Sequence, residues 1–457
     1  MANTYLTWTP SNSGTRAKWT FSAWVKKGET TGNGTLFFSG GSNSDYSKIL
    51  LQSTGKLYIS EVGGGSTIWE IQTNRLFIDA SAFYHIVIVY DSGQGTASNR
   101  VKIYVNGVQE TSLSATSYPA QNRGAQWLAG GQQHRIGRDY ISQYFGGVMS
   151  HIHFSDGYAL APTVFGSTDS TTGEWKINTS PSFTLGTYGF TILKDGSTIT
   201  DQSSNSNNWS LGGGTLTNTK DCPSNVMATM NPLAKFKSGA GITQGNNTVT
   251  MTTAKAGVPS TLGIPSDKGK FYAEFKMTRL AADSRFHFGL LPFECLEADD
   301  PVNAANKGIM LSGYNAAIYA GGGNINAFYG GTGRFNSFTG ILGIAVDLTS
   351  STKTIAFSKD GAWITGSNAT NANYSNALKV NITSYLSISP HWHISVGSGN
   401  SSGTTGIYTM NFGNGFFGTT AITTNSGNGY AGAEGASKFN YAVPSGYSAL
   451  STKGLNQ

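Results

Sequence analysis

Two stretches of the sequence interleave aromatic side chains with Gly, Asn and Arg: NRGAQWLAGGQQHRIGRDYISQYF, residues 122–145, and GYNAAIYAGGGNINAFYGGTGRFNSF, residues 313–338. Sugars present apolar ring faces that stack on Trp and Tyr, while Asn, Asp and Arg supply directional hydrogen bonds. We therefore predict a glycan- or partner-binding role for Trp127, Arg138, Tyr140, Tyr144, Tyr314, Tyr319, Tyr329 and Arg334. Packing in a core is the alternative for each, because a strand buries every second side chain.

Hydrolysis of a glycosidic bond would require two carboxylates that flank it, about 5 Å apart for retention of configuration and further apart for inversion. On a β-sheet such acids stand at alternate positions of one strand, and no run of this kind occurs in the sequence. The letters GNSSG at 399–403 match a nucleophile elbow, but they lie in a Ser/Gly-rich stretch with no strand-to-helix turn. We predict no enzymatic activity and no catalytic residue.

Metal and cofactor motifs are weak. HIHF at 151–154 and HWHI at 391–394 each place two His on one strand face, yet no third ligand is near in sequence, so packing is favoured. ECLEADDP at 294–301 lacks the Asp-x-Asp-x-Gly rhythm of a calcium loop. The G-x-G-x-x-G matches at 413–418 and 427–432 precede no helical pattern. We predict neither a bound metal nor a cofactor.

The elements that must position these residues are short alternating runs. In RVKIYVNG, residues 100–107, Val101, Ile103 and Val105 share one strand face, and Asn106-Gly107 suits a tight hairpin turn. ILGIAVDLTSSTKTIAFSKDGAW, residues 341–363, follows the same pattern and turns at Asp360-Gly361. With 60 Gly, only 12% charged residues and no sustained 3.6-residue period, the chain is predicted to be all-β.

A chain of 457 residues is too long for one ordinary core. We predict a first sandwich over 1–165, a polar connector with a few short strands over 166–232, and a second sandwich over 233–457. Within the connector, TYGFTIL at 187–193 could instead add a strand to the first sandwich.

Charge and cysteine content exclude several classes of protein. The 30 Lys and Arg exceed the 24 acids by six, but they are spread along the chain, so nucleic acid is not a predicted partner. No apolar run reaches 18 residues and no charged segment precedes an apolar one, so neither membrane insertion nor a secretion signal is expected. Cys222 and Cys295 permit at most one disulfide, and the sequence leaves their pairing open.

The first part resembles the laminin-G-like, concanavalin-A-like lectin domain. The segments that carry this resemblance are WTFSAWVKKG, YHIVIVYDS, NRVKIYVNGVQE, RIGRD and YFGGVMSHIHFSDGYALAPTVFG. The second part resembles a SPRY domain in KGKFYAEFKM, GILGIAVDL, KTIAFSKDG and VPSGYSAL, with Phe271 where such domains often carry Trp. The resemblance implies two concanavalin-A-like antiparallel β-sandwiches of jelly-roll type.

This pairing of domains resembles structural or fibre-associated proteins of tailed bacteriophages, marine ones in particular. It implies a homo-oligomeric virion protein, associated with a fibre or spike, whose partners are other virion proteins and whose loops contact host-surface glycans. The alternative is a capsid or tail decoration protein whose loops bind neighbouring virion proteins.

Overall fold

The computed structural model describes residues 3–28, 32–194, 196–234, 239–253, 256–279, 286–292, 307–313, 316–327, 335, 338–366, 369–398, 406–423 and 429–456. The chain divides into two compact units. Unit 1 comprises Met1–Asn218 with Cys222–Ser224, and unit 2 comprises Thr219–Asp221 with Asn225–Gln457. The one α-helix of the described residues is α1 (Thr452–Leu455), so the chain is all-β as predicted. Among these residues no helix has the length and apolar character needed to cross a membrane.

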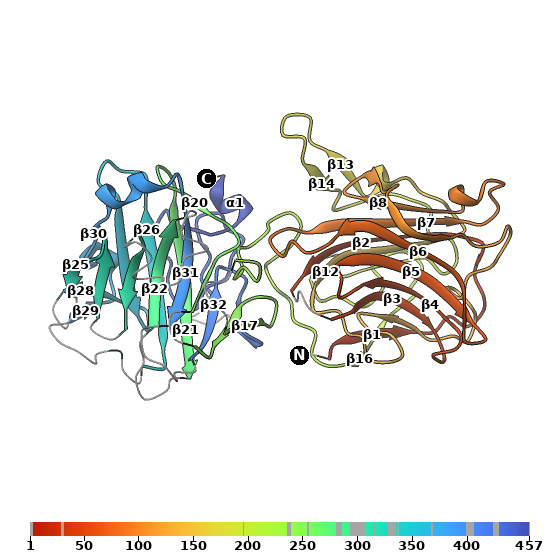
Figure 1. Cartoon of the computed structure of the whole chain (residues 1–457), viewed down its shortest axis with the longest axis horizontal. Helices are drawn as coiled ribbons and strands as arrows, with labels where there is room; N and C mark the ends of the chain where they lie inside the picture. Colours follow the sequence, from red (N-terminus) through yellow and green to blue (C-terminus); the bar gives the residue numbers. More distant parts are fainter. Residues whose placement is uncertain are drawn as a thin grey trace. The chain divides into compact units, whose positions relative to one another are not determined.

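Unit 1 is built from two antiparallel sheets (Figure 1). The eight-stranded sheet runs β10 (Leu113–Ser117), β6 (Ser66–Leu76), β5 (Lys56–Gly63), β4 (Tyr46–Leu51), β3 (Gly34–Gly40), β11 (His134–Ile136), β1 (Tyr5–Trp8), β16 (Ser210–Gly213). The six-stranded sheet runs β15 (Phe190–Ile192), β12 (Gly147–Asp156), β2 (Lys18–Lys27), β7 (Tyr84–Asp91), β8 (Val101–Val105), β9 (Val108–Gln109). A separate hairpin pairs β13 (Gly166–Thr168) with β14 (Trp175–Ile177), and η1 (Ala97–Asn99) and η2 (Pro162–Val164) are single 3₁₀ turns.

The inner faces of both sheets form one aromatic core in unit 1. Trp19 lies parallel to Tyr90, with ring centroids 5.1 Å apart. As predicted, Val101, Ile103 and Val105 point into this core, while the residues between them are partly exposed. Asn106 and Gly107 have φ angles of 48° and 80°, which the tight turn between β8 and β9 requires.

The predicted boundary of the first sandwich is wrong, because much of the predicted connector belongs to unit 1. β15 pairs with β12 and places Ile192 opposite Ile152, so TYGFTIL does add a strand to this sandwich. β16 pairs with β1 and places Leu211 opposite Leu6. Both segments satisfy hydrogen-bonding edges that the two sheets would otherwise leave open.

Unit 2 also consists of two sheets. The larger runs β17 (Ala240–Thr243), β18 (Thr248–Met251), β32 (Gly406–Asn411), β21 (Lys270–Arg279), β26 (Ile341–Asp347), β27 (Thr354–Lys359), β28 (Ala362–Gly366), β29 (Ala369–Asn371), with β30 (Val380–Asn381) beside β27 and β35 (Ser448–Ala449) parallel to β21. The smaller runs β19 (Gly257–Pro259), β31 (His391–Ser398), β22 (Phe286–Pro292), β23 (Ile309–Ser312), β24 (Ala317–Ala320), β25 (Gly323–Ala327), with β20 (Ile264–Pro265) beside β31. A hairpin of β33 (Phe416–Phe417) and β34 (Thr420–Ala421) and the 3₁₀ turns η4 (Tyr374–Asn376) and η5 (Thr383–Ile388) complete it.

The two sheets of unit 2 enclose their own core. Phe275 of β21 stacks on Phe288 of β22, with ring centroids 4.8 Å apart. The predicted hairpin is present, since Ile344 of β26 lies opposite Phe357 of β27. Asp360 and Gly361 have φ angles of 48° and 82° and connect β27 to β28. Each unit is thus a sandwich of antiparallel sheets, apart from the parallel strand β35 in unit 2, and has the expected turn residues.

Candidate functional site

The outer face of the eight-stranded sheet in unit 1 carries a row of side chains that strand register places side by side. In register, Thr7 lies opposite Arg135, Arg135 opposite Phe38, Phe38 opposite Lys48, Lys48 opposite Ser60, and Ser60 opposite Glu70. Residues that lie directly opposite one another on antiparallel strands point to the same face. The positions before or after them, such as Phe37, Ile49 and Ile59, are buried in the core. The row therefore faces away from the core.

A loop between β11 and β12 adds aromatic and cationic side chains to one end of this row. The Arg138 guanidinium lies 4.8 Å from the ring centroid of Tyr5 and 5.1 Å from that of Tyr144. The two tyrosine rings meet edge to face, with centroids 6.1 Å apart. Arg138 Nη2 also donates to Ser142 Oγ at 2.9 Å. These contacts hold the guanidinium between two rings at the surface.

Two further cations repeat this arrangement along the sheet. The Arg135 guanidinium lies 5.5 Å from the Phe38 centroid and 5.7 Å from that of Tyr140. Lys48 Nζ lies 5.2 Å from the centroid of Tyr46, which itself stacks on Phe38 at 5.6 Å. We call the whole group the sheet-face cluster: Tyr5, Phe38, Tyr46, Lys48, Arg135, Arg138, Tyr140 and Tyr144.

The electrostatics of the sheet-face cluster follow from its partial burial. Burial lowers the pKa of Lys48, and Asp139 opposes that shift. Burial also lowers the pKa of Arg135, with the positive charge of Arg138 acting in the same direction. Asp139 is almost fully buried, and its carboxylate accepts from the backbone N–H of Gln143 at 2.9 Å. Asp139 thus acts on Lys48 and Arg135, while the cluster itself contains three cations and no acid and so carries a net positive charge at neutral pH.

The structure brings together three of the residues predicted from sequence, namely Arg138, Tyr140 and Tyr144. Trp127 does not join them, and its prediction as a surface contact is wrong. Its indole is fully buried and packs against Trp19, with centroids 4.9 Å apart, because the loop turns this side chain inward between the sheets. Tyr319 lies in unit 2, on β24, and is partly buried. Tyr314, Tyr329 and Arg334 lie outside the described residues.

Five members of the cluster escaped sequence reasoning: Tyr5, Phe38, Tyr46, Lys48 and Arg135. Each stands on a strand rather than in a loop. The sequence could have shown that these side chains point away from the core, because Tyr46 and Lys48 alternate along the strand with the buried Ser47 and Ile49. The sequence could not show that they lie next to one another on four different strands, because that depends on the register of strand pairing.

A Ser–His pair on the outer face of the six-stranded sheet tests the prediction of no catalysis. Ser22 Oγ lies 2.9 Å from His85 Nε2, as in a nucleophile–base pair. However, Trp175 Nε1 donates to His85 Nδ1 at 2.9 Å, so in the neutral ring the proton stands on Nε2 and points at Ser22. Burial lowers the pKa of His85 to about 3. With an indole where a carboxylate would be needed, His85 cannot take the proton of Ser22.

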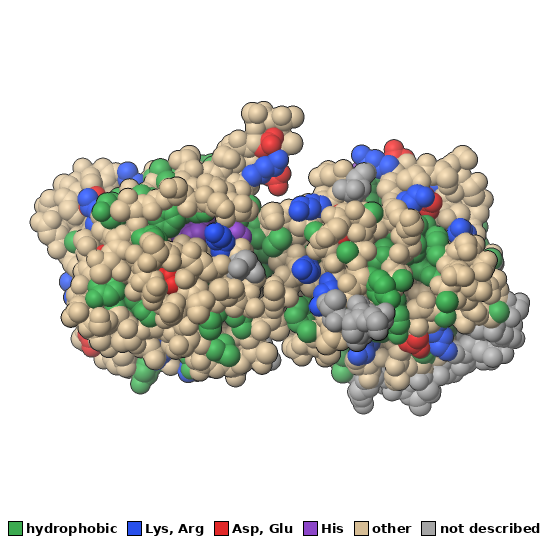
Figure 2. All heavy atoms as spheres, turned by 180° about the vertical axis from the view of Figure 1, so that it is seen from behind, with side chains coloured by type: hydrophobic (Ala, Val, Ile, Leu, Met, Phe, Trp, Pro, Cys, Tyr) green, Lys and Arg blue, Asp and Glu red, His purple; other side chains and the backbone are tan. Residues whose placement is uncertain are grey.

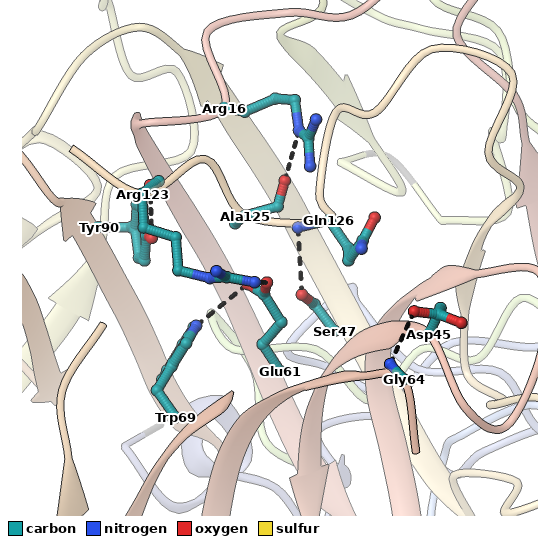
Figure 3. A network of polar contacts seen from close by, with 10 residues as sticks. All are labelled: Arg16, Asp45, Ser47, Glu61, Gly64, Trp69, Tyr90, Arg123, Ala125 and Gln126. Carbon is teal, nitrogen blue, oxygen red and sulfur yellow. Dashed lines mark hydrogen bonds and ion pairs between the residues drawn. The ribbon is translucent and has the colours of Figure 1, made fainter. Parts of the chain in front are cut away.

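A second buried polar network surrounds Glu61 and is shown in Figure 3. Arg123 Nη2 and Nε lie 2.5 Å and 3.0 Å from Glu61 Oε1, and Trp69 Nε1 donates to Oε2 at 3.0 Å. The phenol of Tyr90 donates to the Arg123 carbonyl at 2.8 Å. Both carboxylate oxygens are therefore engaged, and the network anchors the loop that carries Trp127 rather than offering an acid or a base.

Metal binding finds no support among the residues that the structure describes, where no three His, Cys, Asp or Glu side chains gather. His151 and His153 have ring centroids 6.3 Å apart, and His153 Nδ1 hydrogen-bonds with Thr191 Oγ1 at 2.9 Å. His393 Nδ1 lies 2.8 Å from the Ser260 carbonyl. The acidic run at 294–301 lies outside the described residues.

On the face shown in Figure 2, Lys and Arg are scattered and form no continuous stripe.

Comparison with known proteins gives the following matches. No curated protein matches the sequence. A protein from Bacteroides ovatus that is described as a putative carbohydrate binding protein is 17% identical, with a TM-score of 0.33, and the match covers 48% of this chain and 58% of that one. Domains LG4-5 of the mouse laminin alpha1 chain are 11% identical, with a TM-score of 0.28 and coverage of 98% and 84%. The enzymatically active domain of tailspike protein 2 of bacteriophage CBA120 is 13% identical, with a TM-score of 0.25 and coverage of 35% and 25%. Likenesses at this level carry no information on ligand.

The family comparison is more specific for unit 1. Residues 1–164 match the model of the concanavalin A-like lectin/glucanases superfamily. This range holds both long sheets apart from β15 and β16, and it contains the entire sheet-face cluster. Unit 1 therefore contains a concanavalin A-like lectin/glucanase-type domain.

Proposed function

We propose that the protein is a non-enzymatic glycan-binding protein and that unit 1 contacts the glycan through the sheet-face cluster. The observation that carries this proposal is the alternation of rings and cations over β1, β11, β3 and β4, with Arg138 held between Tyr5 and Tyr144. The tyrosine rings of the cluster, which are partly or largely exposed, offer stacking surfaces whose side-chain entropy has already been lost on folding, whereas Phe38 is buried. The indole that donates to His85 Nδ1 argues against turnover at Ser22.

The exposure of the loop fits this role. Tyr140 is 44% exposed and the neighbouring Ile141 is 58% exposed, so apolar surface remains open to a ligand. A sugar ring has one or both faces lined by C–H groups that pack well on such side chains. Ser142, which is also exposed, adds a hydroxyl group to the same loop.

The setting of this binding is part of the proposal. We infer that the protein is a virion component of a tailed bacteriophage, associated with a fibre or spike and present in several copies. This placement is supported by the sequence, in which a lectin-like part is followed by a SPRY-like part, as in structural or fibre-associated proteins of such phages. Many weak sites on one particle would raise the overall avidity for a host-surface glycan. A decoration protein that grips its virion neighbours is the alternative.

Glycan-array binding with the full-length chain tests the proposal. The double variant Tyr5→Ala/Tyr144→Ala removes both rings beside Arg138 and should reduce binding by about tenfold or more. Tyr158→Ala is the matched control, because this ring is 43% exposed in unit 1 but outside the cluster. Equal binding by wild type and the double variant would contradict the role of the cluster. A cryo-electron map of the particle would separate the two settings, since a distal appendage position favours host contact.

A further inference from the structure

Among the residues that the structure describes, no carboxylate forms an ion pair with a cation of the sheet-face cluster. The ion pairs found among the described residues of unit 1 join Lys18 to Asp91, Arg75 to Glu110, Arg123 to Glu61 and Lys176 to Asp169. None of them includes a cation of the cluster. Glu70, at the far end of the row, accepts a hydrogen bond from the Tyr58 phenol at 2.6 Å instead. Among the described residues, Asp139 is the acid whose charge acts on Lys48 and Arg135.

The guanidinium groups also keep most of their donors unused. Within the described part of the chain, their side-chain bonds are Arg135 Nε to Gln133 Oε1 at 2.8 Å and Arg138 Nη2 to Ser142 Oγ. Arg135 Nη1 and Arg138 Nε are buried and have no acceptor there. The two positive charges also repel each other, which contributes to the lowered pKa of Arg135. The cluster therefore holds partly desolvated positive charge that a bound anion would stabilise.

Ring contacts fix where such an anion would lie. Tyr5 and Tyr144 limit the motion of one guanidinium, while Phe38 and Tyr140 limit that of the other. A planar guanidinium can donate two parallel N–H bonds to a carboxylate or a sulfate. Preorganised donors beside exposed rings suit a ligand that carries an anionic oxygen group on an apolar-faced ring.

We infer that the sheet-face cluster recognises an acidic sugar, whose carboxylate or sulfate lies against Arg135 and Arg138 while its ring packs on Tyr140 or Tyr144. This inference rests on the proposed function and adds the chemical class of the ligand. Neutral glycans would then bind with the rings alone and more weakly.

Matched pairs of sugars test the inference with the full-length protein and titration calorimetry. One pair is an oligogalacturonide and its methyl ester, which keeps the ring and removes the charge. The other is a chondroitin sulfate oligosaccharide and its desulfated form. We expect the charged member of at least one pair to bind about tenfold more tightly, with weaker binding at high salt. The pair that responds distinguishes a carboxylate from a sulfate.

Two double variants separate specific recognition from general attraction to a basic protein. Arg135→Gln/Arg138→Gln should abolish the preference within the responding pair. Lys102→Gln/Lys176→Gln removes the same charge from the opposite sheet and the hairpin of unit 1 and should preserve it. Equal binding of charged and neutral members, or equal loss in both double variants, would overturn the inference and leave the proposed function standing. Absence of binding to every charged and neutral sugar would contradict both.

Discussion

Unit 1 and unit 2 both bury histidine and carboxyl side chains, but the buried groups among these whose pKa values shift furthest are of opposite kinds. Unit 1 encloses the neutral imidazoles of His85, His134 and His153, whereas unit 2 encloses the carboxyl group of Glu274. Burial lowers the pKa of the first two histidines to about 3 and about 4, and it raises that of Glu274 to about 7. The same fall in pH should therefore act in opposite directions on these groups.

Hydrogen bonds favour the neutral form of His134 but the charged form of Glu274. His134 Nε2 accepts from the backbone N–H of Leu128 at 2.9 Å, so its Nδ1 carries the proton toward the Gln132 carbonyl at 3.0 Å. A second proton would displace Leu128 from its acceptor. Glu274 accepts from Asn411 Nδ2 and the backbone N–H of Asn440 at Oε2, and from the N–H of Tyr441 at Oε1. These bonds lower its pKa, but complete burial outweighs them.

Acidification of unit 1 is expected to have the largest effect. The pKa of His153 is also lowered to about 3, first by burial and then by neighbouring positive charge. A histidine with a folded pKa below its unfolded value of about 6.5 loses its stabilising contribution as pH falls below 6.5. Between pH 7 and pH 4 each of the three should cost up to about 3 kcal/mol of the free energy of unfolding. Hydrogen exchange, corrected for intrinsic rates, should show this loss in unit 1.

The next prediction concerns Glu274 and has the opposite sign. Because its folded pKa is raised, its contribution is fully present below about pH 4.5 and is lost as pH rises through about 7. Wild-type unit 2 should therefore lose up to about 3 kcal/mol more than Glu274→Gln between pH 4.5 and pH 8. The difference between the two proteins isolates Glu274 from His393, whose lowered pKa acts in the opposite direction. Parallel pH profiles for the two proteins would refute it.

The glycines of the two tight turns, Gly107 in unit 1 and Gly361 in unit 2, should respond alike to substitution. A Cβ on Gly107 would lie 2.4 Å from the Trp175 ring, and one on Gly361 would lie 2.5 Å from the Tyr441 ring. Both residues also have positive φ angles, so Gly107→Ala and Gly361→Ala should each destabilise by about 2 kcal/mol. Gly131→Ala is the control, because its φ is positive but no atom lies within 4 Å of its Cβ. Urea unfolding would measure all three, and a control as costly as the other two would argue against the ring contacts.

The smallest change in the free energy of unfolding is expected for a substitution in the sheet-face cluster, and a substitution in the core of unit 1 gives the contrast. Arg138→Gln removes a partly exposed side chain with one side-chain hydrogen bond. We expect this substitution to change the free energy of unfolding by less than about 0.5 kcal/mol. Trp127→Ala, in contrast, should cost about 4 kcal/mol because it empties a fully buried site. Thermal unfolding of the two variants gives this comparison. A large loss in Arg138→Gln would make its role structural.

The sequence predicted the strand-rich fold because alternation and turn residues act locally, as at Val101–Val105 and Asn106-Gly107. The short strand β16 was harder to assign, since its Leu211 is exposed and the strand owes its place to the open edge of β1. β15, in contrast, buries Phe190 and Ile192 in the core of unit 1. For the candidate site, loop residues such as Arg138 were foreseeable from composition. Trp127 was not, because the direction of a loop side chain depends on the packing around it.

The cross-sheet row from Thr7 to Glu70 also bears on how such a protein could diverge. Each outward residue of the row alternates along its strand with an inward one. Selection can therefore replace an aromatic or a cationic side chain on the outer face while the neighbouring core residue stays unchanged. Preference for a new ligand could then arise by single substitutions on a constant scaffold. Descendants of this chain should accordingly vary at Lys48 and Arg135 far more than at Ile49 and Ile136.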